Sequence, residues 1–372
     1  HVYNNSGYYL LGAIIEKISG QPYAKFVEQR IFVPLGMDNT AYEGFERNAV
    51  PHALGHTRRE SFAASGPIHV SQVYAAGALV STADDMARWD AAIASGKLLK
   101  ASSWKQAFTP YKLADGATIN YGYGFEVGKL NGAGKAFHAG RVTGFMAFTL
   151  RVPEKNVFVA VLTNSDGGLT DPEMVANKAA AIAMGAPFPD FKPVAVAPEA
   201  LDAYVGIYKA DGEPARTIRR DGDRLVMQRA GGGMVPLQAY KQDGFVVPDS
   251  LTTVSFERNG KGDVSRLAMA SDGGDPVWHA NTGEKPVERK VVKIANETFD
   301  AYLGRYQVAP GFQIEVKREG DKYIAQATGQ RPFELFPLSE SKFFVTVVDA
   351  DVRFAKAPEG GMQLFLSPNG AE

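Results

Sequence analysis

An internal repeat in the second half of the chain limits what that half can fold into. The segment LDAYVGIY at residues 201–208 aligns without a gap on FDAYLGRY at residues 299–306, which is an offset of 98 positions. Residues 217–228 align on residues 315–326 at the same offset. Two ungapped matches in one register indicate a duplication. The repeated unit is longer than the roughly 20–50 residues of solenoid repeats, so it is a duplicated domain.

The two copies have the pattern of β structure. Each contains short alternating runs separated by glycine-containing turns, and Asp221-Gly222 aligns with Glu319-Gly320 where a hairpin turn is expected. We therefore expect each copy to be a small antiparallel barrel or sandwich, closed so that no long strand edge is exposed. The expected bounds are 198–286 and 295–372, after a proline-rich linker over residues 187–197.

The first half of the chain, residues 1–186, mixes helices and strands. Apolar side chains recur at helical spacing before the stop residue Gly20, at Tyr8, Leu11, Ile15 and Ile18. Residues 145–152 and 157–163 are rich in β-formers, and the segment PEKN between them predicts a hairpin. The fold class predicted for the whole chain is α+β, with a mixed domain followed by two antiparallel β-barrel domains.

Composition excludes several classes of function. The 372 residues carry a formal net charge of −1, so no basic field exists to attract nucleic acid. Cysteine is absent, which excludes thiol catalysis and disulfides. No apolar run reaches the ~18 residues that a membrane span needs. His52 and His56 have the spacing of zinc ligands, but Pro51 and Gly55 favour a loop, and we expect no metal and no organic cofactor.

A tyrosine and an asparagine stand two residues apart at the start of the first predicted helix. In Tyr3-Asn4-Asn5 the phenol and the carboxamide would lie near the positive end of the helix dipole. A phenol in such a site can donate or accept a proton, and an asparagine can bind a substrate amide. The alternative is that Asn5 or Ser6 only caps the helix while Tyr3 packs, and the hexapeptide alone favours this alternative.

A histidine-x-glycine sequence lies on a predicted strand, at His138-Ala139-Gly140, and Arg141 follows it. The glycine removes a side chain that would block a ligand from lying against the strand edge. The backbone N–H of Arg141 can then point at a developing oxyanion. The alternative is a histidine satisfied within its strand beside a turn, and this short motif alone favours it.

The order of the two motifs is specific, and together they resemble the β-lactamase-related serine hydrolases. This family includes class C β-lactamases, D,D-peptidases, D-aminopeptidases and esterases. Tyr3-Asn4-Asn5 resembles its Tyr-x-Asn motif, and His138-Ala139-Gly140 resembles its Lys-Thr-Gly motif in the His-x-Gly form. The resemblance covers residues 1–186 and implies an antiparallel sheet flanked by helices. The repeated Tyr-x-Gly-x-Tyr pieces at 204–208 and 302–306 resemble the lipocalin-like barrels that follow some of these hydrolases.

The resemblance implies a reaction and a role for each motif residue. A serine would attack an ester, a β-lactam or a D-amino-acid amide in a small molecule or short peptide and form an acyl-enzyme. Tyr3 would transfer protons together with a lysine, and Asn5 would bind the substrate amide. Gly140 and the N–H of Arg141 would face the oxyanion, while His138 would bind the substrate carboxylate or support Tyr3. Histidine at position 138 favours a peptidase or esterase over a β-lactamase, because neutral imidazole holds a carboxylate less firmly than an ammonium does.

The family's nucleophile belongs to a Ser-x-x-Lys motif that precedes the Tyr-x-Asn motif. Two such strings occur, from Ser102 to Lys105 and from Ser339 to Lys342, but neither has the expected order or setting. We therefore expect the nucleophile in a segment upstream of His1, and this chain, as an N-terminally truncated form, to be inactive alone. The resemblance also favours a periplasmic or envelope location. The alternatives are a non-catalytic binding or sensor protein that uses its barrels, and a cytoplasmic esterase whose barrels gate access.

Overall fold

The structure is a computed structural model that describes residues 1–42, 53–58, 61–66, 68–167, 171–287, 289–358 and 360–368. The chain divides into two compact units. The first contains His1–Asp190 with Asp272–Asp275, and the second contains Phe191–Ser271 with Pro276–Glu372.

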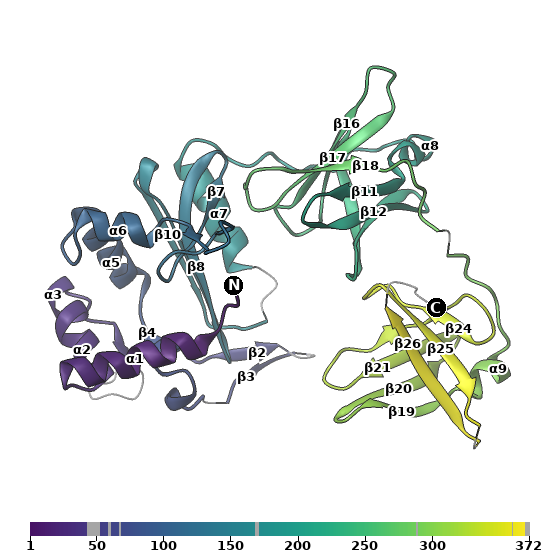
Figure 1. Ribbon diagram of the computed structural model, residues 1–372, viewed down its shortest axis with the longest axis horizontal. Coiled ribbons are helices and arrows are strands. Elements are labelled where there is room, and N and C mark those ends of the chain that lie inside the picture. The colour runs from purple at the N-terminus through teal and green to yellow at the C-terminus, as the bar shows by residue number, and fades with distance from the viewer. Residues whose placement is uncertain are drawn as a thin grey trace. The chain divides into compact units, whose positions relative to one another are not determined.

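The first unit begins with helix α1, Asn5–Ser19, as the apolar spacing predicts (Figure 1). Asn4 has extended backbone angles, and its side-chain oxygen accepts a hydrogen bond from Gly7 N at 2.9 Å, so Asn4 is the N-cap. Gly20 ends the helix in the left-handed conformation at φ 69°. A Cβ at Gly12 would lie 2.6 Å from Cε1 of Tyr74, so this glycine lets α1 approach helix α4, Tyr74–Gly77, closely.

The helical turns that directly follow α1 pack around a largely aromatic core. Tyr23, Val27, Phe32 and Met37 are buried there. This core lies along a helical segment made of α2 (Tyr23–Val27), a π-helical turn (Glu28–Phe32) and α3 (Val33–Leu35). Further along the chain are a 3₁₀ turn (Val70–Gln72), α5 (Ala83–Ser95), α6 (Ala101–Ala107) and α7 (Pro172–Ala183). Asp171 caps α7 by accepting from Glu173 N at 2.9 Å.

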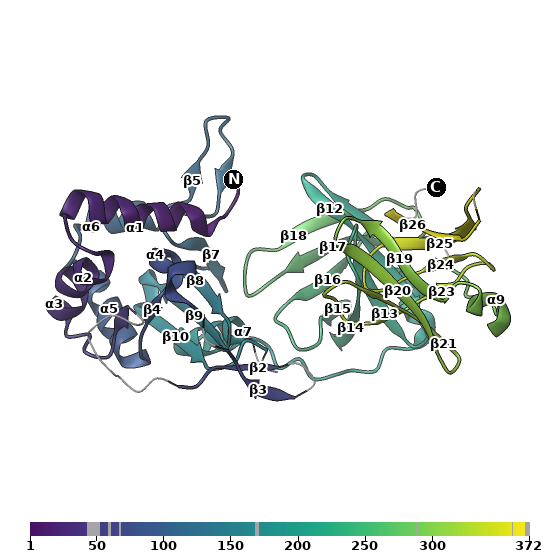
Figure 2. The same cartoon turned by 90° about the horizontal axis from the view of Figure 1, so that it is seen from below.

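An antiparallel sheet with the strand order β10-β9-β8-β7 forms the centre of the unit. Its strands are β7 (Glu126–Leu130), β8 (Ala133–Val142), β9 (Phe145–Val152) and β10 (Val157–Thr163). One face packs against α7, where Phe148 and Leu150 meet Ala176 and Ala180. The predicted hairpin between β9 and β10 is confirmed, with a 3₁₀ turn at Pro153–Lys155 and left-handed Asn156. This layering confirms the expected sheet flanked by helices (Figure 2).

Three two-stranded sheets complete the unit. They pair β1 (Ala41–Tyr42) with β4 (Leu79–Val80), β2 (His56–Arg58) with β3 (Phe62–Ala64), and β5 (Tyr111–Lys112) with β6 (Thr118–Ile119). None of the helices in the described ranges is long and apolar enough to cross a membrane.

The first β copy is a closed antiparallel barrel of eight strands, as expected. In order these are β11 (Gly206–Ala210), β12 (Glu213–Asp221), β13 (Arg224–Arg229), β14 (Met234–Lys241), β15 (Gly244–Val246), β16 (Thr253–Arg258), β17 (Val264–Ala270) and β18 (Val277–Asn281). Pairing of β18 with β11 closes the ladder. The interior is apolar, and Tyr208, Ile218, Val254 and Leu267 are fully buried in it.

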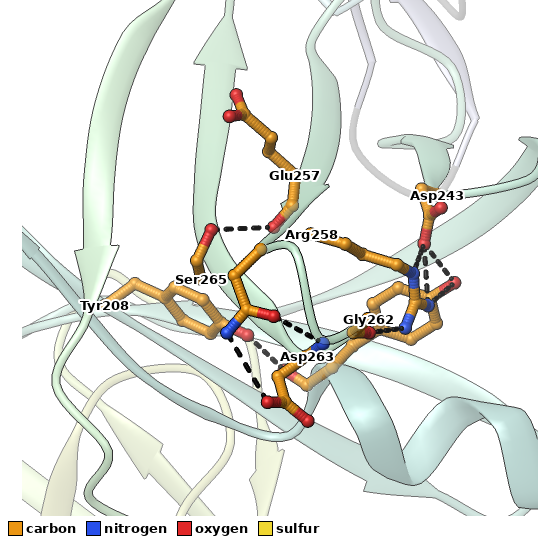
Figure 3. Close-up of polar contacts among 9 residues, drawn as sticks. Tyr208, Asp243, Glu257, Arg258, Gly262, Asp263 and Ser265 are labelled. Carbon is orange, nitrogen blue, oxygen red and sulfur yellow. Dashed lines mark hydrogen bonds and ion pairs between the residues drawn. The ribbon is translucent and has the colours of Figure 1, made fainter.

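Helix α8 (Pro198–Leu201) and a 3₁₀ turn (Asp202–Tyr204) add Leu201 and Tyr204 to the core of this barrel. Beside them lies an ion pair that Figure 3 shows: Oδ1 of Asp243 accepts from Nε and Nη2 of Arg258 at 3.0 and 2.8 Å. The same oxygen accepts from the Tyr204 hydroxyl at 2.9 Å. The network ties the turn before β15 and the end of β16 to the 3₁₀ turn.

The second copy repeats the contacts of the first. The Tyr208 hydroxyl donates to Tyr204 O at 2.7 Å, and the Tyr306 hydroxyl donates to Tyr302 O at 2.8 Å. Arg220 pairs with Asp202, and Arg318 pairs with Asp300, again 98 positions later. Both copies begin with a short helix, which is α9 (Asn296–Asp300) in the second. The duplication is therefore present in three dimensions.

The second copy differs from a closed barrel, so the prediction of two barrels is corrected for it. Its strands form two four-stranded sheets, β19-β20-β21-β22 and β23-β24-β25-β26. The strand equivalent to β14 is interrupted at buried Leu335, between β22 and β23. The bounds are β19 (Gly304–Ala309), β20 (Phe312–Glu319), β21 (Lys322–Ala327), β22 (Phe333–Glu334), β23 (Phe336–Pro337), β24 (Lys342–Phe344), β25 (Ala350–Lys356) and β26 (Met362–Pro368).

Candidate functional site

Tyr3 in the loop before α1 and Asn5 at the first position of α1 both lie at the surface. The side chain of Asn4, rather than Asn5 or Ser6, caps the helix, so the capping alternative for Asn5 is wrong. The Asn5 carboxamide oxygen instead accepts from the Tyr3 hydroxyl at 3.4 Å. The Tyr3 side chain is 51% exposed, so its phenol is accessible to a ligand.

Tyr3 and His138, 135 positions apart in the chain, lie side by side in the folded unit, with ring centroids 6.0 Å apart. A third aromatic residue, Tyr121, completes the group, and its ring centroid lies 6.0 Å from that of Tyr3. The Tyr121 hydroxyl is 2.9 Å from Nε2 of His138. An isolated bridge between Tyr121 and Glu126 holds Tyr121 at the start of β7.

The contacts of His138 define its tautomer. Nδ1 lies 2.7 Å from the carbonyl oxygen of Ala139, which can only accept a hydrogen bond, so Nδ1 carries a proton. In the neutral ring Nε2 is then the acceptor, and the Tyr121 hydroxyl donates to it. Burial, followed by a hydrogen bond with Tyr8, raises the pKa of Tyr121 above its ordinary value, which keeps this donor protonated. His138 is thereby oriented from two sides.

The strand that carries His138 has an unpaired edge at the site. The ladder between β7 and β8 ends at Glu126 and Phe137. Residues 138–142 continue to pair with β9, as far as Val142 and Phe145. Among the strands in the described ranges, none pairs with the other side of residues 138–142. An extended ligand can therefore form backbone hydrogen bonds along this edge.

The register places the backbone of Arg141 on the unpaired edge. Val142 and Phe145 flank the two-residue turn, so they form a hydrogen-bonded pair. The backbone N–H and C=O of Val142 therefore point toward β9. Backbone groups alternate along a strand, so those of Gly140 and His138 also point toward β9. The N–H groups of Ala139 and Arg141 consequently face away from β9. The guanidinium of Arg141 takes no part in this arrangement, since Nη2 donates to the backbone oxygen of Asp166.

Gly140 leaves the strand open, because a Cβ there would meet only Ala147, at an ordinary 3.7 Å.

The turn between β8 and β9 is fixed by Asp166, which sequence reasoning missed. Oδ2 of Asp166 accepts from Gly144 N at 2.8 Å and from the Thr57 hydroxyl at 3.0 Å. The Gly144 hydrogen bond is the main cause that lowers the pKa of Asp166 below its ordinary value. A Cβ on Gly144 would lie 2.9 Å from Cα of Gly55 and would also clash with Ser65. The hairpin that carries Arg141 is therefore held against the β2–β3 sheet.

The two Ser-x-x-Lys strings lie in different surroundings. Ser102 and Lys105 are exposed on α6 and lie in an open surface depression with Gln106 and Thr109. Ser339 accepts from the backbone N–H of Lys342 at 3.1 Å, and the ammonium of Lys342 pairs with Asp351.

The described residues contain no group of three or more histidine, aspartate or glutamate side chains that could hold a metal ion. His56 starts β2, and its N–H donates to the carbonyl of Asn164 at 2.9 Å. His52 lies outside the described residues.

Two family models match the chain. The Beta-lactamase model matches residues 1–183, which include the whole candidate site. The first half of the chain is a beta-lactamase-family domain. A second model, a domain of unknown function named DUF3471, matches residues 191–281 and 288–370, which correspond to the two β copies.

Curated relatives agree with this assignment. Penicillin-binding protein 4* of Bacillus subtilis is 26% identical over 387 aligned positions that cover 100% of this chain and 65% of that protein. D-aminopeptidase of Gluconobacter oxydans is 25% identical over 190 positions, which cover 50% of this chain and 35% of that protein. The chain therefore spans about two thirds or less of the length of these relatives.

Among solved structures, the octameric penicillin-binding protein homologue from Pyrococcus abyssi aligns with 74% of this chain and 64% of its own, at 23% identity and a TM-score of 0.46.

Proposed function

We propose that this chain is part of a serine hydrolase that cleaves D-amino-acid amides or short peptides through an acyl-enzyme. The observation that carries the proposal is the approach of Tyr3 to His138, at 6.0 Å between ring centroids, beside an unpaired strand edge in a beta-lactamase-family domain. The D-aminopeptidase relative and the neutral histidine at position 138 favour an amide or peptide over a β-lactam.

Each site residue has a proposed task. The substrate lies extended along residues 138–142, where Gly140 leaves room and the Arg141 N–H helps to bind the oxyanion. Asn5 donates its amide N–H to a substrate carbonyl while its oxygen contacts Tyr3. Tyr3, whose hydroxyl is accessible, transfers the proton between the serine and the leaving amine. His138 is a positioning residue for Tyr3 and for the substrate carboxylate, and Tyr121 fixes its orientation.

The serine and lysine of the family motif are proposed to belong to a segment outside these 372 residues. Neither string inside the chain lies where the motif would be needed, and the match covers 65% of penicillin-binding protein 4*. On this proposal the chain by itself does not hydrolyse substrate. The same proposal includes the domain bounds 1–186, 198–286 and 295–372. It also includes an envelope location, which the penicillin-binding relatives favour.

The test uses the protein produced from the complete reading frame. A fluorescent penicillin and a fluorophosphonate probe are each added, and the labelled peptide is identified by mass spectrometry. We expect one serine in a Ser-x-x-Lys motif that precedes Tyr3 to be labelled, and D-amino-acid amides to be cleaved faster than L-amides or acyl esters. Absence of labelling by both probes would favour the non-catalytic binding protein instead. Faster cleavage of simple acyl esters would favour the esterase.

A further inference from the structure

The first barrel carries two arginines facing each other across neighbouring strands. Arg216 on β12 is directly opposite Arg229 on β13 in the register of the ladder. Arg216 is only 5% exposed, whereas Arg229 is at the surface. Like charges directly opposite each other destabilise a sheet. We therefore expect another interaction to offset the repulsion between these two arginines.

Both arginines belong to the inner face of the barrel. Side chains alternate along a strand, so Arg216 shares a face with Ile218 two residues later, and Ile218 is fully buried in the barrel core. Arg229 likewise shares a face with Met227, another core residue. The guanidinium of Arg216 donates to Pro214 O at 2.7 Å, which places it at the end of the barrel where β12 begins.

In the second copy the two equivalent positions are occupied by apolar residues that only pack in the core. The residues 98 positions later are Ile314 and Ala327, which face each other in the same way on β20 and β21. They are 2% and 4% exposed and belong to the core of their domain. An apolar pair therefore suits this backbone, and the arginine pair is a property of the first copy only.

A buried histidine lies on the same inner face, toward the same end. His279 on β18 is opposite the core residue Leu267 and is fully buried. Its Nδ1 lies 3.2 Å from Val277 O, whereas Nε2 has no hydrogen-bond partner. Buried polar atoms normally have partners, so an unpartnered ring nitrogen indicates a missing contact.

The acidic residue beside the arginines does not balance their charge. Glu213 approaches Arg216 to 3.8 Å, and its own side chain is 42% exposed. Burial, and next the charge of Arg229, lower the pKa of Arg216 below its ordinary value, which is what an uncompensated cation pair does. An arginine stays protonated nonetheless, so Arg216 and Arg229 both remain cationic.

We propose that this end of the first barrel binds a small oxyanion between Arg216 and Arg229, with His279 as a further polar contact. Guanidinium groups bind carboxylate and phosphate oxygens through paired N–H donors, so the ligand is a small carboxylate or phosphate compound. An anion between the arginines removes their mutual repulsion. Nδ1 of His279 donates to Val277 O, so Nε2 is an acceptor, and a hydroxyl group of the ligand can donate to it. The proposal concerns the β domain alone and does not depend on the hydrolase reaction.

The test measures binding of succinate and of inorganic phosphate to the full 372-residue chain by titration calorimetry at fixed ionic strength. The variants are Arg229→Ala, which changes an exposed side chain, and the double variant Arg216→Ile with Arg229→Ala, which reproduces the pair of the second copy. Arg224→Ala is the matched control, because Arg224 pairs with Asp221 in an exposed turn. In parallel, the imidazole resonances of His279 are followed during each titration.

We expect one of the two anions to bind saturably and to shift the His279 resonances. Arg229→Ala should weaken this binding at least about tenfold, and the double variant should abolish it, while Arg224→Ala leaves it unchanged. Binding of succinate alone would assign a carboxylate ligand, and binding of phosphate alone would assign a phosphate ligand. The proposal is overturned if neither anion binds saturably, if Arg229→Ala binds as tightly as the wild type, or if equimolar chloride competes equally well.

Discussion

The Tyr121 hydroxyl lies 2.9 Å from Nε2 of His138, and the carbonyl of Ala139 lies 2.7 Å from Nδ1 of the same ring. The Ala139 carbonyl can only accept, so in the neutral imidazole these two contacts select the Nδ1–H tautomer. The ring that faces Tyr3 is therefore held in one orientation.

Replacing Tyr121 by phenylalanine should release this ring. In Tyr121→Phe we expect the ¹⁵N resonance of His138 Nε2 to move from that of a hydrogen-bonded acceptor to that of a free one. Unfolding free energy should fall by about 1 kcal/mol through the lost hydrogen bond. Tyr123→Phe is the control, since Tyr123 is 62% exposed and forms no contact in this group. Unchanged His138 resonances in Tyr121→Phe would refute the hydrogen bond from the Tyr121 hydroxyl to Nε2.

The Asp243–Arg258 pair should make the first barrel sensitive to acid. Hydrogen bonds from Arg258 are the main cause that lowers the pKa of Asp243 below its ordinary value, against the effect of burial. The charged form therefore stabilises the folded state. This contribution is complete above the unfolded pKa, about 3.9, and is lost as the pH falls through the lower folded pKa.

Asp243→Asn should reduce unfolding free energy by about 1–2 kcal/mol at pH 7, a value that allows for partial exposure of the pair (Figure 3). Urea unfolding at a series of pH values should show a smaller loss of stability below pH ~4 in this variant than in the wild type. Asp223→Asn, at an exposed turn position, serves as the control. Equal acid sensitivity of Asp243→Asn and the wild type would exclude the pair as its source.

The turn at Gly144 should tolerate no side chain. Gly144 has a φ of 84°, and a Cβ there would clash with Gly55 and Ser65, whereas Gly132 has a φ of 90° and open space around it. Gly132→Ala should therefore cost about 1 kcal/mol for the backbone conformation alone. Gly144→Ala should cost about 2 kcal/mol more, because backbone atoms must shift. Similar unfolding midpoints for the two variants would contradict the close approach of the β2–β3 sheet to this turn.

The approach of Tyr3 to His138 could be predicted from the sequence, whereas Tyr121 could not. The first two residues belong to short motifs whose order along the chain is specific. Tyr121 precedes β7 in a glycine-rich segment without a clear period, and only its bridge to Glu126 brings it to the site. Asp166 was missed for a similar reason, since it follows the end of β10 and its partners come from elsewhere in the chain.

Local ambiguity also limited the sequence analysis. Asn4, Asn5 and Ser6 can all cap a helix, and the choice of Asn4 depends on its backbone angles of −152° and 143°, which form only in the folded chain. The repeat predicted two β domains, but it could not predict their closure. Leu237 lies inside a continuous strand, whereas its equivalent Leu335 interrupts one, although both are buried leucines.

The central claim, that the Tyr3 phenol takes part in the reaction, is tested most directly by Tyr3→Phe in the protein from the complete reading frame. Release of p-nitroaniline from a D-amino-acid anilide is compared with that of Tyr9→Phe, which removes another exposed hydroxyl from α1. We predict that Tyr3→Phe lowers kcat about 10²–10⁴-fold with little change in KM, while Tyr9→Phe stays close to the wild type. A Tyr3→Phe enzyme with the kcat of the wild type would contradict the account.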